Sequence, residues 1–387
     1  MPNIFKDEAG GHGGDLTRAL ELWCPDGGRI IDFSSNVNPL GPPEGLLEHL
    51  KESLPDIVHY PSPQARELRE QLSIFLDLSE KRLILGNGAN ELIHLLVIWK
   101  RPRRVFIPAP TFSEYERAAN LAEAQVERYS LPPGEAFDPR ILAERLGSGD
   151  LVVFCNPSNP TGKLFSRQKL LELVLLAEKR EAQVMIDESF IPLTGNPETS
   201  LRKAGTGNLW IALSLTKLWA LPGLRLGCLI GPESGMEKLI RWGDPWRVNT
   251  LAQKAGLYCL RQEGYLEKTL KLIDQERRYL TACLMEKGVF RVFAGAANYL
   301  LVQGTVRGFD VADFQAELAR QGVLIRRADN FHGLDQRFFR VAVLQRRDNN
   351  RLVEAIGRYM EKFHAGSPEP SEAGKDETGG FKGGESR

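Results

Sequence analysis

A lysine with hydroxyls and an arginine near it lies close to the middle of the chain. Lys217 belongs to the segment "SLTKLWALPGLRLG", three residues after Ser214 and eight before Arg225, and the apolar run "LWIAL" leads into it. A lysine amine can form a Schiff base with an aldehyde cofactor, and burial or nearby positive charge lowers its pKa toward the reactive neutral form. The hydroxyls of Ser214 and Thr216 and the guanidinium suit the oxygens of a phosphate. The segment therefore indicates a carbonyl-trapping lysine beside an anion site, with a solvated loop lysine as the alternative.

Three more stretches place polar groups where apolar runs end. In "VMIDES" the run ends in Asp187, a carboxylate that is costly to bury unless a cation, such as a protonated pyridine nitrogen, is its partner. In "CNPSNPTGKLF" the Asn-Pro pairs fix a turn that leaves Asn159 with an amide donor for a phenolic oxygen. In "LGNGANELIHLL" the amides near Gly88, Ala89 and Asn90 can face an anion at a helix N-terminus. An amine, a phosphate cradle, a buried carboxylate and an amide donor are the groups that pyridoxal phosphate needs.

The segments around these residues predict an α/β fold. Continuous apolar runs alternate with amphipathic stretches such as "SRQKLLELVLLAEKR", a pattern typical of a mostly parallel sheet with helices on both faces. In such a sheet ligands bind beyond the carboxyl ends of the strands, which is where the polar residues above fall. Phe112, in "PAPTFSEY", follows a strand in the same way and could stack on a cofactor ring or simply belong to the core. We count seven strands, in "LILGNGA", "RVFIPAP", "AQVERYS", "DLVVFCNPSN", "AQVMIDES", "LWIALSLT" and "LRLGCLIG".

The pattern changes along the chain and predicts four parts. A Gly- and Pro-rich stretch, residues 1–45, looks like an extended N-terminal arm, and residues 46–248 form the large domain with the sheet. Long helical stretches followed by the strand candidates "ANYLLVQG", "VLIRRA" and "FFRVAV" indicate a smaller α+β domain over residues 249–364. Residues 365–387 have little apolar content, so we expect a disordered tail.

Composition limits the partners. Among 387 residues, Lys plus Arg and Asp plus Glu number 50 each, so no global field attracts nucleic acid or an anionic membrane. No apolar stretch is long enough to span a membrane, and the N-terminus lacks the build of a signal peptide, so we expect a cytoplasmic protein. Five cysteines lack C-x-x-C spacing and six histidines lack H-x-x-x-H spacing, so we expect no disulfide framework and no metal site.

Four motifs in register carry a family resemblance. "ANEL", "NPSNPTG", "IDES" and "SLTKLWALPGLRLG", in this order and spacing, resemble the class I and II pyridoxal-phosphate-dependent aminotransferases over nearly the whole chain. The resemblance implies the fold-type I architecture, pyridoxal 5'-phosphate bound to Lys217, and a homodimer with its active site at the subunit boundary. Tyr60, in "HYPSP", is similar to the family tyrosine that reaches the partner subunit's cofactor phosphate.

The two ends of the chain resemble one group within this family. "HGGDL", "IDFSSNVNPLGPP" and "VLIRRADNFHGLDQRFFRVAV" are similar to the threonine-phosphate decarboxylases of cobalamin biosynthesis. That resemblance implies decarboxylation of L-threonine O-3-phosphate to (R)-1-amino-2-propanol O-2-phosphate, for the aminopropanol arm of cobalamin. It implies that Arg340 binds the substrate carboxylate, that His12, Asn36 and Arg326 bind the substrate phosphate or its surroundings, and that Gly13 and Asn159 also bind the substrate.

One position departs from the aminotransferase pattern and leaves alternatives open. Where those enzymes often carry a tyrosine three residues after the aspartate, this chain has Phe190, which cannot donate a hydrogen bond to the phenolic oxygen of the cofactor. The first alternative activity is that of a histidinol-phosphate aminotransferase or a related aminotransferase. A non-catalytic regulator that binds pyridoxal phosphate is the remote alternative.

Overall fold

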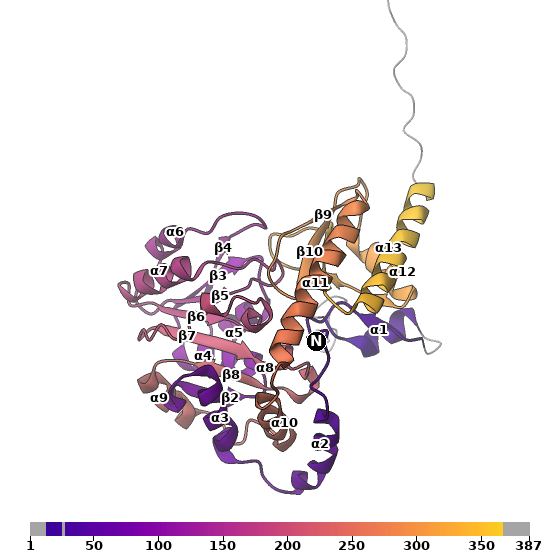
Figure 1. Cartoon of the computed structure of the whole chain (residues 1–387). Coiled ribbons are helices and arrows are strands. Elements are labelled where there is room, and N and C mark those ends of the chain that lie inside the picture. Colours follow the sequence, from indigo (N-terminus) through magenta and orange to yellow (C-terminus); the bar gives the residue numbers. More distant parts are fainter. Residues whose placement is uncertain (1–12, 25–27, 367–387) are drawn as a thin grey trace, which may run out of the picture.

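The computed structural model describes residues 13–24 and 28–366, and its largest element is a seven-stranded sheet (Figure 1). Four neighbouring pairs of strands are parallel, whereas β8 runs antiparallel to both β2 and β7. The predicted seven strands and the mostly parallel sheet are thus confirmed. In spatial order the strands are β2 (Leu83–Gly86), β8 (Gly227–Ile230), β7 (Leu209–Ser214), β6 (Gln183–Asp187), β5 (Leu151–Cys155), β3 (Arg104–Ala109) and β4 (Gln125–Ser130).

The sheet is buried on both faces, which explains why its strands are continuously apolar. Along β5, Val152 and Phe154 pack into one hydrophobic core, while Val153 and Cys155 pack into another on the opposite face. Helices cover both cores. The first core includes residues of α3 (Arg66–Leu76), α6 (Pro139–Glu144), α7 (Arg167–Glu178) and α10 (Thr250–Leu260), and the second includes residues of α4 (Ala89–Lys100), α5 (Glu114–Leu121) and α9 (Glu233–Trp242).

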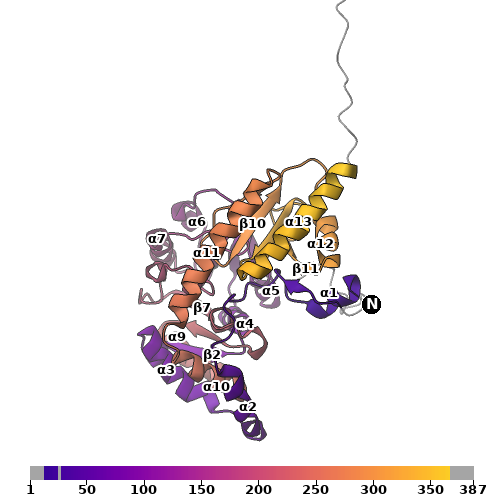
Figure 2. The ribbon, with the colours of Figure 1, turned by 45° about the vertical axis from the view of Figure 1, so that its right-hand side comes forward.

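A second sheet of four antiparallel strands forms the C-terminal part. Its order is β12 (Arg326–Arg327), β13 (Phe338–Ala342), β10 (Tyr299–Gly304) and β9 (Phe290–Val292). The long helices α11 (Tyr265–Glu286) and α13 (Arg346–Gly366) lie side by side next to it, and α12 (Val311–Arg320) completes the same core (Figure 2). The predicted strands "ANYLLVQG" and "FFRVAV" are confirmed, whereas "VLIRRA" divides into β11 (Val323–Leu324) and β12.

The prediction of a purely extended N-terminal arm is wrong. The arm contains helix α1 (Leu16–Trp23), which begins where the Asp15 side chain accepts a hydrogen bond from the Arg18 N–H group, and strand β1 (Ile31–Asp32). Strand β1 pairs in parallel with β11, so the arm joins the C-terminal part of the fold. The chain then enters α2 (Leu46–Glu52).

Packing also differs from the predicted domain boundary at residue 248. Helix α10 follows that boundary, yet its Ala252, Ala255 and Cys259 belong to the core of the large sheet. Helix α13 continues to Gly366, just past the start of the predicted tail, and residues 367–387 lie outside the described part of the chain. The remaining helical turns are α8 (Leu215–Leu218) and six 3-10 turns, Leu54–Val58, Pro63–Ala65, Glu80–Arg82, Ile191–Leu193, Pro197–Thr199 and Pro222–Leu224.

Residues 13–24 and 28–366 are predicted to contain neither a membrane span nor a metal site. None of the helices there has the length and apolar content needed to span a membrane. The same residues contain no group of three or more His, Cys, Asp and Glu side chains that could hold a metal ion.

Candidate active site

A cavity of about 390 Å³ opens beyond the carboxyl ends of the parallel strands. Its volume lies within the usual range for small-molecule sites. It is bounded by the ends of β5, β6 and β7, by the N-terminus of α4 and by strands β12 and β13 of the smaller sheet. The cavity lining brings together most residues that the sequence predicts for a site: Gly13, Asn36, Ala89, Asn90, Phe112, Asn159, Asp187, Ser214, Thr216, Lys217, Arg225, Arg326 and Arg340.

Lys217 lies in the short helix α8, directly after β7, so the strand carries its side chain to the cavity. Burial, together with the positive charges of Arg340 and Arg225, lowers the pKa of its amine to about 8. The neutral, nucleophilic form is therefore accessible near neutral pH. The solvated loop lysine, the alternative interpretation, does not describe this residue.

The segment around Lys217 ends in a compact group of anion-binding donors. The hydroxyls of Ser214 and Thr216 lie 2.9 Å apart in buried positions. Arg225 has left-handed backbone angles, with φ of 58°, and its guanidinium reaches the start of α4. A Cβ atom at Gly88 would lie only 2.5 Å from Nη2 of Arg225, so a larger residue there would displace the guanidinium.

The N-terminus of α4 completes this group. The first backbone N–H groups of a helix have no partner within the helix, and in α4 these belong to Ala89 and Asn90. Nδ2 of Asn90 donates a hydrogen bond to Glu114 at 3.1 Å, so this atom is engaged within the protein. Asn90 offers the site its backbone N–H group and its Oδ1 atom, while Gly88 lies behind Arg225 and does not itself line the cavity.

Asp187 is buried at the end of β6 and both of its oxygens accept hydrogen bonds. Oδ2 accepts from the Tyr115 hydroxyl at 2.7 Å, and Oδ1 accepts from the Ser189 N–H group at 2.9 Å. Sequence reasoning missed Tyr115, which lies three residues after Phe112 on the buried side of α5. Nothing in "TFSEY" separates it from an ordinary core aromatic residue.

Arg326 and Arg340 face each other across the smaller sheet. They are directly opposite in the antiparallel pairing of β12 with β13, and both side chains are buried. Arg340 donates to Asn159 Oδ1 and, at 2.7 Å, to the Ser34 carbonyl, while Arg326 donates to Asn330 Oδ1 at 2.9 Å. Burial lowers the pKa of Arg340 to about 10, and burial together with the charge of Arg340 lowers that of Arg326 to about 9. This end of the cavity therefore carries concentrated positive charge.

The stretch between β1 and α2 connects the two sheets at the cavity. Ala342 of β13 donates its N–H group to the Phe33 carbonyl at 2.8 Å. A few residues later, the Asn38 N–H group donates to the Lys217 carbonyl at 3.2 Å, and the Asn38 side chain donates to Leu218 at 2.7 Å. Asn36, which lies in this stretch and lines the cavity, is thus placed by contacts with both halves of the fold, whereas Gly13 precedes α1 and lies against Ser34.

Two predicted site residues, Tyr60 and His12, and the departing residue Phe190 remain to be placed. Tyr60 does not line the cavity: its side chain is 85% exposed, and its ring lies 5.2 Å from that of Trp246. His12 lies outside the described residues. Phe190 does line the cavity, and its ring meets Tyr299 edge-on at 5.0 Å.

Polar atoms in the cavity wall test whether pyridoxal phosphate fits. Among the described residues, Asn36 Oδ1, Asn90 Oδ1 and Arg340 Nε are buried without a hydrogen-bond partner, and all three residues line the cavity. Buried polar atoms in native proteins almost always have partners, so these three indicate a polar ligand. A group with a phosphate, a ring nitrogen and a phenolic oxygen matches the donors and the carboxylate described above.

Comparison with known proteins agrees with this geometry. Residues 28–356 match the family described as aminotransferase class I and II. The chain belongs to this family. Its cofactor is pyridoxal phosphate, and its fold is that of the fold-type I aminotransferases.

Within the family, this chain is similar to threonine-phosphate decarboxylases and to histidinol-phosphate aminotransferases, as three proteins show. The threonine-phosphate decarboxylase of Salmonella typhimurium is 32% identical over 89% of this chain and 95% of its own length. The structure of histidinol-phosphate aminotransferase from Clostridium acetobutylicum is 30% identical, with a TM-score of 0.80 over 86% of this chain and 100% of that chain. The structure of L-threonine-O-3-phosphate decarboxylase from Porphyromonas gingivalis is 26% identical, with a TM-score of 0.77 over 86% and 100%.

Proposed function

We propose that this enzyme decarboxylates L-threonine O-3-phosphate to (R)-1-amino-2-propanol O-2-phosphate and carbon dioxide, in the aminopropanol arm of cobalamin biosynthesis. The similarity to threonine-phosphate decarboxylases supports the proposal. We place the cofactor phosphate against Ser214, Thr216, Arg225 and the start of α4, the ring nitrogen against Asp187, and the phenolic oxygen against Asn159.

The observation that carries the proposal is the pair of buried arginines on β12 and β13. Like charges directly opposite in an antiparallel pair destabilise a sheet, so Arg326 and Arg340 favour a ligand that brings negative charge. A phosphorylated amino acid brings two anions, a carboxylate and a phosphate. With Arg225 assigned to the cofactor phosphate and Arg117 paired with Glu114, Arg326 and Arg340 are the cavity arginines left for these two groups.

The chemistry follows from how the cavity residues hold this substrate. Bound pyridoxal phosphate supplies an electron-accepting ring that takes up the electron pair left when a bond at the substrate Cα breaks. Arg340 and Arg326, by holding the substrate at both ends, would fix which Cα bond is aligned for cleavage, and such positioning can contribute several kcal/mol. With the bond from Cα to the carboxylate so aligned, its electron pair would pass to the bound cofactor and carbon dioxide would leave.

Lys217 then completes the reaction. Its amine, with a pKa near 8, can carry a proton at neutral pH and deliver it to the substrate Cα, which replaces the lost carboxylate with hydrogen. Phe190 has no hydroxyl to donate to the phenolic oxygen, so one contact expected in many aminotransferases is missing here.

Histidinol-phosphate aminotransferase activity is the second candidate, because a structure of that enzyme has a TM-score of 0.80 with this chain. Histidinol phosphate has no carboxylate to lose. An enzyme that acts on it transfers the amino group instead and needs an acceptor such as 2-oxoglutarate for turnover. The test uses the purified enzyme with each substrate, with and without acceptor. We expect carbon dioxide from phosphothreonine without acceptor. Acceptor-dependent turnover of histidinol phosphate, with no carbon dioxide from phosphothreonine or phosphoserine, would contradict the proposal.

We further propose a homodimer in which Tyr60 reaches the cofactor phosphate of the partner subunit. The exposure of Tyr60, which does not line the cavity of its own chain, supports this arrangement. The expected measurement is a dimer mass in solution, together with weaker cofactor binding in Tyr60→Phe. A cytoplasmic location stays a prediction.

A further inference from the structure

Tyr115 is a buried polar residue of the cavity wall to which the roles above assign nothing. It lies in α5, its side chain is fully buried, and it lines the cavity with Asp187 and Phe112. Its hydroxyl donates to Oδ2 of Asp187 at 2.7 Å across 72 positions of sequence. The contact therefore joins a helix on one face of the sheet to the carboxylate at the end of β6.

Two donors fix the carboxylate of Asp187. The Ser189 N–H group holds Oδ1 at 2.9 Å while Tyr115 holds Oδ2, so the plane of the carboxylate is defined from both sides. Hydrogen bonds to a charged form favour that form. Burial, followed by the charge of Asp187, raises the pKa of Tyr115 well above its usual range, so the phenol stays protonated and acts as a donor.

The ring of Tyr115 makes a second contact, with another residue that we expect to touch the cofactor. It meets the ring of Phe112 edge-on, with centroids 5.6 Å apart and an interplanar angle of 84°. Phe112 is the aromatic residue that we expect against the face of the cofactor ring. A single side chain thus touches both the partner of the ring nitrogen and the stacking residue.

We infer that Tyr115 is a positioning residue for the cofactor, an inference that rests on the proposed placement of pyridoxal phosphate in this cavity. Its hydroxyl orients Asp187 toward the ring nitrogen, and its ring supports Phe112 against the ring face. A tyrosine with a merely structural role would contribute to folding stability and would leave the affinity for the cofactor unchanged.

Two variants separate the two contacts. Tyr115→Phe removes the hydroxyl and keeps the ring, whereas Tyr115→Leu removes both. The dissociation constant of pyridoxal phosphate from the apo-protein is measured by fluorescence, and thermal unfolding is recorded with and without cofactor. We expect a dissociation constant about tenfold higher for Tyr115→Phe, since a hydrogen bond to a charged group is lost, and a larger increase for Tyr115→Leu.

Tyr359→Phe is the matched control, because Tyr359 is a nearly buried tyrosine whose ring packs on Phe314 in the smaller domain. It should keep the dissociation constant of the wild type. A Tyr115→Phe variant with a lower unfolding temperature and wild-type cofactor affinity would overturn the inference. If Tyr115→Phe does not fold, Phe112→Leu provides a second reading: we expect about threefold weaker binding, and unchanged binding would overturn the role of the supported ring.

Asp187→Asn, measured in parallel, separates this inference from the proposed cofactor site. If Asp187→Asn weakens binding and Tyr115→Phe does not, only the role of Tyr115 is wrong. If neither variant changes the dissociation constant, the proposed placement of the cofactor fails as well. If both weaken binding and the pH dependence of the bound cofactor's absorption shifts in both, the inference is supported.

Discussion

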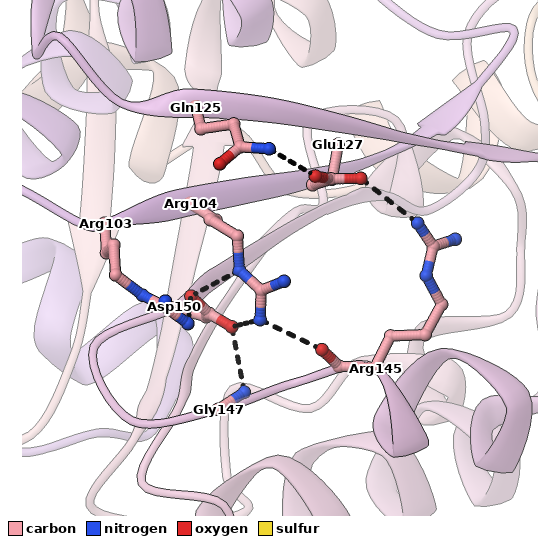
Figure 3. Close-up of polar contacts among 7 residues, drawn as sticks. All are labelled: Arg103, Arg104, Gln125, Glu127, Arg145, Gly147 and Asp150. Carbon is pink, nitrogen blue, oxygen red and sulfur yellow. Dashed lines mark hydrogen bonds and ion pairs between the residues drawn. The ribbon is translucent and has the colours of Figure 1, made fainter.

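The two edges of the large sheet bury charge in opposite ways. At the amino edge, the fully buried side chain of Asp150 precedes β5 and meets Arg104 at 2.6 Å and Arg103 at 3.6 Å (Figure 3). It also accepts a hydrogen bond from the Gly147 N–H group at 2.8 Å. Beside it, Glu127 accepts from Arg145 at 3.2 Å. Positive and negative groups alternate, so the network needs nothing from outside the chain.

At the carboxyl edge, positive charge exceeds negative charge. Lys217, Arg225, Arg326 and Arg340 line one cavity with Asp187. Burial lowers the pKa of Arg340, and burial together with neighbouring positive charge lowers the pKa values of Lys217 and Arg326. A buried group of one sign is costly unless it is paired. Matched buried charges thus stabilise the fold, whereas an excess of one sign marks the place where a ligand supplies the opposite charge.

Lys217→Ala should have the largest effect on chemistry. We expect turnover to fall by about a thousandfold, the scale of a lost proton-transfer group, and the cofactor to lose its covalent attachment. Borohydride reduction and peptide mapping of the wild type should find the cofactor on Lys217. Attachment of the cofactor to another lysine would contradict the proposed role of Lys217.

Arg104→Met should have the largest effect on stability, because it leaves the buried carboxylate of Asp150 poorly paired. We expect a loss of about 3 kcal/mol in the free energy of unfolding, measured with urea, and unchanged turnover per folded molecule. Arg103→Ala is the matched control: its side chain is 65% exposed, so we expect less than about 1 kcal/mol. Equal losses in the two variants would contradict the difference drawn between buried and exposed partners.

Arg225→Ala should act on the cofactor more than on folding. Charge-assisted hydrogen bonds contribute about 1.5–3 kcal/mol, so the dissociation constant of pyridoxal phosphate should rise roughly tenfold to a hundredfold. The exposed Arg347→Ala serves as the control for a lost surface charge. An unchanged dissociation constant with normal activity would show that Arg225 does not bind the cofactor phosphate.

Arg326→Met tests whether the two arginines at the carboxyl edge repel each other. Removing one of two like charges opposite each other should increase the stability of the apo-protein by up to about 1 kcal/mol, while the KM for phosphothreonine rises. Arg327→Met, beside it, removes an ion pair with Asp329 and should bring no such gain. If Arg326→Met loses as much stability as Arg327→Met, then repulsion between Arg326 and Arg340 does not destabilise the apo-protein.

The pH dependence of cofactor association gives the smallest effect. Because the Lys217 amine has a pKa of about 8 in place of 10.5, its neutral fraction rises as pH increases through 8, and the association rate measured by stopped flow should rise and then level off. In Arg340→Ala the midpoint should move to higher pH, since the guanidinium charge lowers this pKa. A midpoint that stays in place would assign the shift to burial alone.

The sequence predicts the strand ends well and the contacts between distant elements poorly. Asp187, Asn159 and Lys217 could be placed together because apolar strands end at polar residues and parallel strands share one carboxyl edge. The bond from Tyr115 to Asp187 could not be predicted, because it depends on how α5 packs against β6.

Two misjudged segments have related causes. Helix α1 and strand β1 lie among glycines and prolines and are stabilised by contacts with the C-terminal part, which local composition does not record. The amphipathic pattern of α10 predicts a buried face but not which core receives it. The register that sets Arg326 opposite Arg340 is likewise decided by the pairing of β12 with β13.

The stretch between β1 and α2 has a consequence for protein synthesis. Ser34 is held by Arg340, a residue 306 positions later, and Phe33 is held by Ala342. A nascent chain that has emerged as far as the end of α10 contains all seven strands of the large sheet and the helices α9 and α10 that pack on it, with Lys217 in place after β7, but lacks the wall that these late residues form. Such a chain can bury its sheet before it can hold a substrate, so the reaction begins only when the first and last strands of the fold have met.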